Sequence, residues 1–269
     1  MPRNRTRSGV SVLYKIMTAL LYISLAGSLL FAGLAVHEYL PVYSSDRKIE
    51  ELKKDAVAEP GKDPLKRSVD FAWLRSVNPD IIGWLYIPGT TIDFPILKGK
   101  TDTEYLWKGP DKNYSPVGSL FTFADEPGDM SGANPYIFGH TLPMFDMFGE
   151  LRMYQEEAEY RKTRNTAYIY TPSASYEVQL YSVFRCRYDD RVFTHNMGLN
   201  SSEYSSRIRE YKKRNEHPDI PKIEEGWDWA SAQTFSLSSC HGSVGTPYRL
   251  VTNWINTRIE YKIENKLLD

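Results

Sequence analysis

The stretch FSLSSCHGSVGTPYRLVTNW, residues 235–254, contains two short runs with strand character and the loop that joins them. The first run ends at Cys240, one of only 2 cysteines in the chain, and the second begins near Arg249. Glycines and a proline in the loop favour a turn, so the facing ends of the two strands should lie close together. The stretch therefore predicts a thiol and a guanidinium at the same edge of a β-sheet.

A thiol beside a fixed cation can serve as a nucleophile. The thiolate is the reactive form of cysteine, and a neighbouring positive charge favours it. A guanidinium held in place can also stabilise negative charge that develops on a carbonyl oxygen. Arg249 shares its strand face with Val251 and Asn253, so it need not be buried in the core. Taken alone, Cys240 and Arg249 still allow the simpler interpretation of a buried thiol and a solvated surface charge.

A third residue favours the chemical interpretation. The run NPYIFGHT, residues 134–141, is a short apolar strand that ends in a glycine and then His140. A histidine at that position projects from the end of a strand into a loop. A cysteine with a histidine elsewhere in the chain is the general pattern of a nucleophile and its acid–base partner. Cys240, His140 and Arg249 are therefore the candidate catalytic residues.

These three places together resemble the sortase family, and specifically its class B members. The family's usual run before the cysteine is Thr-Leu-X-Thr-Cys, and both threonine positions are serine here, at Ser236 and Ser239. The resemblance extends from about residue 78 to residue 263. It includes NPDIIGWLYIPGTTIDFPIL at residues 78–97 and HTLPMFDMFGEL at residues 140–151.

The resemblance implies a cysteine transpeptidase. Cys240 would attack a backbone carbonyl in the C-terminal sorting motif of a secreted protein and form a thioester. His140 would exchange protons with the leaving and incoming amines, and Arg249 would bind substrate and steady the oxyanion. The acceptor would be an amino group of peptidoglycan or of another surface protein. Ser238, Ser239 and His241 are the expected substrate-binding residues, although family members often carry an acidic residue in place of His241.

No metal or other cofactor is expected. Class A sortases use calcium, but the sequence contains no equivalent acidic cluster, and its histidines lack the close spacing of zinc ligands. His195 is expected to be a loop residue rather than a ligand. Cys186, in the middle of a predicted strand, is expected to be a buried free thiol, because a disulfide would silence Cys240. The net charge of -1 gives no argument for a nucleic-acid partner.

The N-terminal sequence predicts a single membrane anchor. Residues 1–15 are basic and form the expected cytoplasmic tail, and residues 16–36 contain no charged residue. A helix of about 20 apolar residues spans a bilayer, and the basic flank predicts that the rest of the chain lies on the extracellular side of the cell membrane. A cleavable signal peptide is the alternative, although its apolar region is usually about 7–15 residues long.

The remaining chain predicts a polar stalk at residues 37–66 and a catalytic domain at residues 67–269. Ser68 is expected to cap a short helix at residues 69–76, and a helix at residues 201–216 precedes the cysteine strand. Short strands are predicted at residues 83–87, 91–97, 118–123, 135–138, 166–171, 176–187, 233–239, 248–254 and 258–263. The expected fold is mainly β: a closed eight-stranded sortase-type barrel with N-terminal helices.

Two other functions remain open at this point. An L,D-transpeptidase is also a surface cysteine enzyme, but its run is Ser-His-Gly-Cys, whereas the order here is Cys240-His241-Gly242. The second alternative is a membrane-anchored binding module without catalysis, in which Cys240 is part of the core. An electrophilic thiol reagent separates this second alternative from an enzyme, because a core thiol in the folded protein stays unlabelled whereas a catalytic one reacts quickly.

Overall fold

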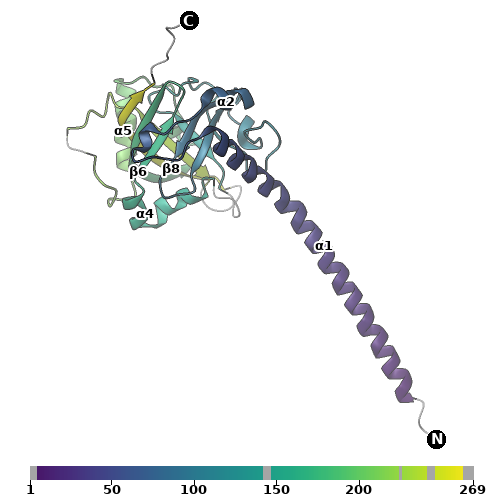
Figure 1. Cartoon of the computed structure of the whole chain (residues 1–269). Coiled ribbons are helices and arrows are strands. Elements are labelled where there is room, and N and C mark those ends of the chain that lie inside the picture. The colour runs from purple at the N-terminus through teal and green to yellow at the C-terminus, as the bar shows by residue number, and fades with distance from the viewer. Residues whose placement is uncertain (1–4, 142–146, 224–225, 241–245, 263–269) are drawn as a thin grey trace. The chain divides into compact units, whose positions relative to one another are not determined.

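The computed structural model describes residues 5–141, 147–223, 226–240 and 246–262, with the backbone alone for residues 5–11, 38 and 240. Two compact units divide the chain, Met1–Ser44 and Ser45–Asp269. Helix α1, Arg5–Ala56, forms the described part of the first unit and continues into the second (Figure 1).

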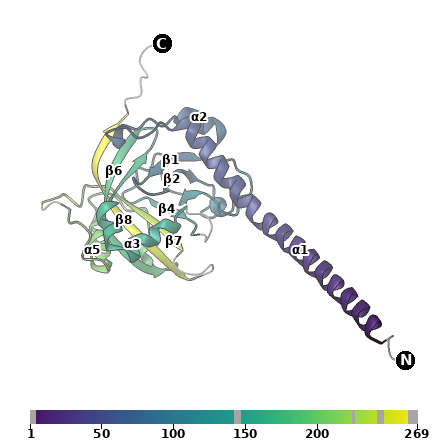
Figure 2. The same cartoon turned by 60° about the horizontal axis from the view of Figure 1, so that its bottom comes forward.

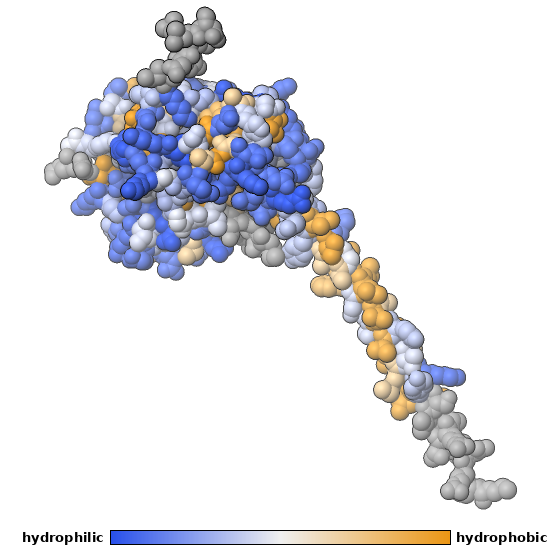
Figure 3. Space-filling model, viewed as in Figure 1, coloured by the Kyte–Doolittle hydropathy of each residue, from blue (hydrophilic) through white to orange (hydrophobic). Residues whose placement is uncertain are grey.

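The first unit is an apolar helix. From Val12 onward, α1 is long and apolar enough to cross a membrane, and Figure 3 shows the hydrophobic residues that follow one another along it. A membrane anchor and an N-terminal signal sequence share these properties. The prediction of one apolar N-terminal helix is confirmed at that level.

The second unit is built around a closed barrel of eight strands in the order β1-β2-β3-β4-β7-β8-β6-β5 (Figure 2). Strands β2 and β3 pair in parallel, as do β4 and β7, and the other neighbours are antiparallel. The predicted closed barrel is thus confirmed. Its strands are β1 Ile81–Tyr86, β2 Asp93–Lys98, β3 Leu120–Thr122, β4 Tyr136–Gly139, β5 Thr166–Tyr170, β6 Ala174–Arg187, β7 Thr234–Cys240 and β8 Tyr248–Tyr261.

The last strand differs from its prediction. Residues 248–254 and 258–263 were expected to form two strands, whereas β8 is a single strand of 14 residues. It can continue because β6, also 14 residues long, pairs with it from end to end. The register shifts between Glu177 and Val178, which accommodates the polar residues that separate the two apolar runs of β8.

Short helices surround the barrel. The predicted helix at residues 201–216 is confirmed as α5, Ser202–Arg214, whose side chains Tyr204, Ile208 and Tyr211 are buried on one stripe. It packs against β6. The remaining elements are η1 Pro64–Lys66, α2 Phe71–Val77, η2 Glu104–Leu106, η3 Gly149–Arg152, α3 Met153–Glu156, α4 Ala158–Thr163 and η4 Arg191–Phe193.

The predicted cap of α2 is wrong. Asp70, not Ser68, precedes the helix, and its carboxylate accepts a hydrogen bond from the Trp73 N–H at 2.9 Å. Asp70 can take this position because the chain just before it is extended: Val69 forms a β-bridge with Val57.

The barrel unit includes the last turns of α1. Ile49, Leu52 and Ala56 are buried, and Lys53 forms an ion pair with Asp93 of β2 at 3.0 Å. The compact unit therefore begins at Ser45, ahead of residue 67, where the catalytic domain was expected to start. The apolar spacing at the end of α1 explains this boundary, since these residues lie on one face of the helix.

Candidate active site

The strand register brings the three predicted catalytic residues to one end of the barrel. In the parallel pair of β4 and β7, Gly139 lies opposite Ser239, so the next residues, His140 and Cys240, occupy corresponding positions. In the antiparallel pair of β7 and β8, Cys240 lies opposite Arg249. The structure describes Cys240 by its backbone, and His241 lies outside the described residues.

His140 is oriented by a backbone carbonyl. Its Nε2–H donates a hydrogen bond to the carbonyl oxygen of Leu106, the last residue of η2, at 2.7 Å. The ring centroid lies 5.2 Å from that of Trp107. With the proton on Nε2 committed to Leu106, Nδ1 is the basic nitrogen of the neutral ring. His140 can therefore exchange a second proton through Nδ1.

The surroundings of His140 disfavour its charged form. Burial is the main cause that lowers the pKa of the imidazole below its ordinary value, and the positive charge of Arg249 lowers it further. The hydrogen bond to Leu106 acts in the opposite direction. Imidazolium is consequently scarcer at neutral pH than it would be for an exposed histidine.

Arg249 is fixed by its own loop and strand. Its Nη1 donates to the carbonyl oxygens of Thr246 at 2.9 Å and of Tyr248 at 3.0 Å. The guanidinium carbon lies 5.9 Å from the centroid of the Tyr188 ring. These contacts hold a permanent positive charge at the end of β8, where it can bind an anionic or developing oxyanion group.

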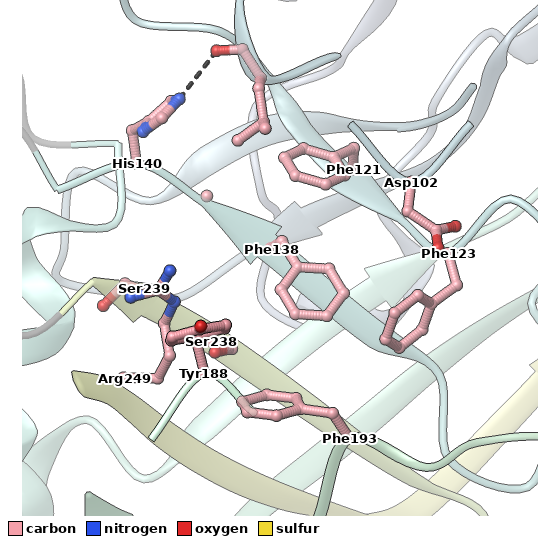
Figure 4. A pocket seen from close by; sticks show the side chains of 12 residues that line it. Asp102, Phe121, Phe123, Phe138, His140, Tyr188, Phe193, Ser238, Ser239 and Arg249 are labelled. Atoms are coloured by element: carbon pink, nitrogen blue, oxygen red, sulfur yellow. Dashed lines mark hydrogen bonds between the residues drawn. The ribbon is translucent and has the colours of Figure 1, made fainter. Parts of the chain in front are cut away.

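A pocket of about 270 Å³ opens beside these residues. Figure 4 shows His140, Ser239 and Arg249 at its left, with the phenylalanine rings occupying most of the remaining lining. Its lining is thus aromatic with a polar end, which is typical of a site that binds an organic ligand. The lining residues are Asp102, Leu106, Phe121, Phe123, Phe138, Gly139, His140, Tyr188, Phe193, Ser238, Ser239 and Arg249.

Two of the three expected substrate-binding residues line this pocket. Ser238 is 1% exposed, and its Oγ has no hydrogen-bond partner within the part of the chain that the structure describes. Ser239 is 3% exposed. A buried hydroxyl without a partner costs free energy unless a ligand satisfies it. Ser238 is therefore suited to a hydrogen bond with a bound substrate.

The aromatic wall of the pocket did not emerge from the sequence. Phe121 and Phe123 alternate along one strand face, and Phe138 on β4 lies in register with Ser238 on β7. That alternation is a signal that could have marked an aromatic strand face. Phe193 gives no comparable signal, because its place depends on how η4 folds back over the sheet.

The second cysteine has a different environment. Cys186 is a free thiol and 6% exposed, as predicted. Burial raises the pKa of this thiol to about 12, so very little thiolate forms at neutral pH. Within the described residues, no group of 3 or more His, Cys, Asp or Glu side chains is arranged to hold a metal ion.

Comparisons with known proteins agree on one family, although no family model matches the chain. The sequence is 26% identical to sortase B of Staphylococcus aureus over 145 residues, covering 54% of this chain and 58% of that protein. It is 29% identical to sortase B of Listeria monocytogenes over 116 residues, covering 43% and 47%. The matches thus span about half the length of these relatives.

Solved structures of sortase B share the fold. The structure of the Bacillus anthracis enzyme in complex with AAEK1 superposes with a TM-score of 0.67 at 20% identity, covering 82% of this chain and 99% of that one. The sortase B–substrate complex from Staphylococcus aureus superposes with a TM-score of 0.61 at 21% identity, covering 70% and 85%.

Proposed function

Because this chain is a relative of the sortase B proteins and has their fold, we propose that it is a cysteine transpeptidase. It cleaves the C-terminal sorting motif of secreted proteins and joins the new carboxyl end to an amino group of peptidoglycan or of another surface protein. The observation that carries the proposal is the strand register, which aligns His140, Cys240 and Arg249 beside an aromatic pocket.

The first half of the reaction forms a thioester. The Cys240 sulfur attacks the carbonyl carbon of the scissile peptide bond, and a C–S bond forms as the carbonyl π electrons move to oxygen. Arg249 stabilises this oxyanion. When the C–N bond breaks, the imidazolium of His140 gives its Nδ1 proton to the departing amine.

The second half reverses the proton transfers. The incoming amine attacks the thioester carbon, His140 takes a proton from it, and the Cys240 thiolate leaves as the new amide forms. The thiolate–imidazolium pair is thereby regenerated. Because burial and Arg249 lower the pKa of His140, a smaller share of the enzyme carries this pair than would with an exposed histidine, and slow turnover is expected.

The pocket supplies the binding surface for the sorting motif. Its aromatic lining excludes water from the apolar parts of an extended peptide. The hydroxyl of Ser238, which has no hydrogen-bond partner among the described residues, is available to a backbone group of that peptide, and Ser239 lines the approach to Cys240. His241 follows the nucleophile directly in the chain and is proposed as a third contact.

The apolar helix places the enzyme at the cell surface in this proposal. Residues 16–36 anchor the chain in the membrane, and the basic residues before them keep the N-terminus in the cytoplasm. The barrel unit then lies outside the cell, where secreted proteins and the cell wall meet. The carbonyl carbon and the acceptor amine are both available there.

The test is a transfer assay with the full chain in detergent. We expect at least one peptide from a small library of sorting-motif sequences, those of the Asn-Pro-x-Thr-Asn kind included, to be cleaved and joined to an added amine, and the product masses to identify the motif and the acceptor. Cys240→Ala should abolish cleavage and transfer, whereas Cys186→Ala should retain most of the activity. His140→Ala should lower the rate by about 10²–10⁴-fold.

The proposal fails if a folded Cys240→Ala protein still transfers the peptide, or if Cys186→Ala is the inactive variant. Labelling by iodoacetamide gives an independent readout. Cys240 should react rapidly, and Cys186 should remain unlabelled in the folded protein because its pKa is about 12.

A further inference from the structure

The wall of the pocket opposite His140 is assembled from two distant segments. Phe123 follows β3 directly, and Phe193 is the last residue of η4. Both rings contact Phe138 of β4, with centroid distances of 4.9 Å and 6.2 Å. Figure 4 shows the three rings around the same hollow. The shape of the pocket thus depends on how residues 190–196, called here the η4 segment, are held against the end of β3.

His195 and Asp125 tie these two segments together. The His195 Nε2–H donates to Asp125 Oδ1 at 2.7 Å, and Asn196 Nδ2 donates to Asp125 Oδ2 at 2.6 Å. The same His195 ring stacks on Phe123, with centroids 3.8 Å apart and planes inclined by 7°. His195 therefore contacts two residues that follow β3: it donates a hydrogen bond to the carboxylate of Asp125 and stacks on the pocket-lining ring of Phe123.

His195 also reaches the other half of the wall. Its Nδ1 lies 3.2 Å from the carbonyl oxygen of Phe193. Both ring nitrogens therefore face oxygen atoms, one on Asp125 and one on the backbone of Phe193. The hydrogen bonds from Asn196 and His195 lower the pKa of Asp125, in that order of importance. Asp125 thus stays anionic and is a strong acceptor for this arrangement.

The other hydrogen bonds and ion pairs that attach this segment to its surroundings, among the described residues, involve residues 190–192. Arg207 donates to the carbonyl of Arg191, Tyr136 donates to that of Val192, and Arg214 pairs with Asp190. Between Thr194 and Asn196, the described hydrogen bonds that reach another segment are those to Asp125. Without them, Phe193 would lose the support on its C-terminal side.

We propose that His195 and Asp125 are positioning residues that hold the Phe123–Phe193 wall in the shape required by the bound sorting peptide. This proposal rests on the proposed function. Neither side chain lines the pocket, so neither is expected to touch the peptide or to take part in proton transfer. Their loss should weaken peptide binding and leave the chemical step intact.

Kinetics of full-length variants in detergent test the proposal. His195→Ala and Asp125→Ala should each raise KM roughly tenfold for the sorting-motif peptide that the wild type cleaves, the worth of about one well-placed hydrogen bond. The value of kcat should stay within about twofold. Since either substitution removes the same hydrogen bond between His195 and Asp125, the double variant should raise KM no further than either single variant.

Two more variants separate the stacking of His195 on Phe123 from its hydrogen bond to Asp125. His195→Phe keeps a ring to stack on Phe123, and His195→Gln keeps a donor for Asp125, so each should recover part of the loss. The matched control is Glu51→Ala, which removes an exposed carboxylate of a surface ion pair with Arg47 and should leave KM unchanged. An unchanged KM in His195→Ala, or a fall in kcat alone, would overturn the proposal.

Amide hydrogen exchange tests, without any substrate, whether the contact between His195 and Asp125 holds the η4 segment in place. The Thr194 amide donates to the carbonyl of Arg191, and its exchange should quicken at least tenfold in His195→Ala and in Asp125→Ala but not in Glu51→Ala. If the wild type turns over no peptide, the proposed function fails. Faster exchange of the Thr194 amide in the two variants would still support the positioning role of His195 and Asp125. Unchanged exchange of the Thr194 amide in both variants would overturn the positioning role, whether or not the protein is active.

Discussion

His140 and Arg249 influence each other through their charges. The guanidinium is fixed by the carbonyls of Thr246 and Tyr248, so its positive charge cannot move away when the imidazole is protonated. This repulsion adds to burial in lowering the pKa of His140. In the proposed mechanism, the cation that stabilises the oxyanion therefore also lowers the amount of the protonated His140 that serves as general acid.

The first prediction concerns this coupling. In Arg249→Gln the positive charge is removed, so the pKa of His140 should rise, while burial keeps it below the ordinary value. Arg249→Lys is the matched control: it retains the charge, and the His140 pKa should stay near that of the wild type. The measurement is an NMR titration of the His140 ring in the full chain, with folding checked by circular dichroism. An identical His140 pKa in all three proteins would show that the charge of Arg249 does not reach the imidazole.

At the scale of elements, α5 is attached to the sheet through buried polar groups. The hydroxyl of Tyr211 accepts a hydrogen bond from Asn134 Nδ2 at 3.0 Å and also contacts the hydroxyl of Tyr136. Tyr136 donates in turn to the carbonyl of Val192, just before Phe193. The helix therefore supports the strand β4 and the η4 segment at the same place.

The second prediction is that Tyr211→Phe lowers the free energy of unfolding by about 1–3 kcal/mol, because it leaves the buried amide of Asn134 without its partner. Tyr114→Phe, which removes a hydroxyl from a side chain that is 73% exposed, should change it by less than about 0.5 kcal/mol. Urea unfolding monitored by circular dichroism measures both. Equal stabilities would mean that solvent or another group replaces the Tyr211 hydroxyl.

Elements with strong local patterns could be predicted, and those that depend on partners could not. The apolar stripe of α5 is visible in the sequence, as are the strands that lead to His140 and Cys240. The continuity of β8 was missed because it depends on pairing with β6, and Asp70 was missed as a cap because Val69 is held by Val57. Contacts between distant segments likewise decide the pocket wall.

At the scale of the whole molecule, the barrel unit has its own core. It begins at Ser45, and the last turns of α1 contribute Ile49 and Leu52, which are 1% and 7% exposed. The ion pair of Lys53 with Asp93 adds a polar contact to the same attachment. Residues 45–56 therefore belong to the folded barrel unit.

The third prediction compares two truncations. Removal of residues 1–44 should leave a soluble barrel unit with an intact cooperative unfolding transition. Removal of residues 1–57 should lower the free energy of unfolding by about 3 kcal/mol or more, because each buried isoleucine or leucine side chain contributes about 1.5–3 kcal/mol. Urea unfolding of both proteins in detergent-free buffer gives the comparison. If the shorter protein proves as stable as the longer one, the last turns of α1 contribute nothing to the core.

The parallel pairing of β4 with β7 has a consequence for the life of the chain before it is folded. The two strands are far apart in sequence, and contacts between distant segments form late because a long loop must close first. In a nascent or partly translocated chain, His140 and Cys240 would thus still be apart, and the proposed peptide transfer could not occur. Catalytic competence should return during refolding only when the barrel closes, so transfer activity would report the final folding event rather than the collapse that precedes it.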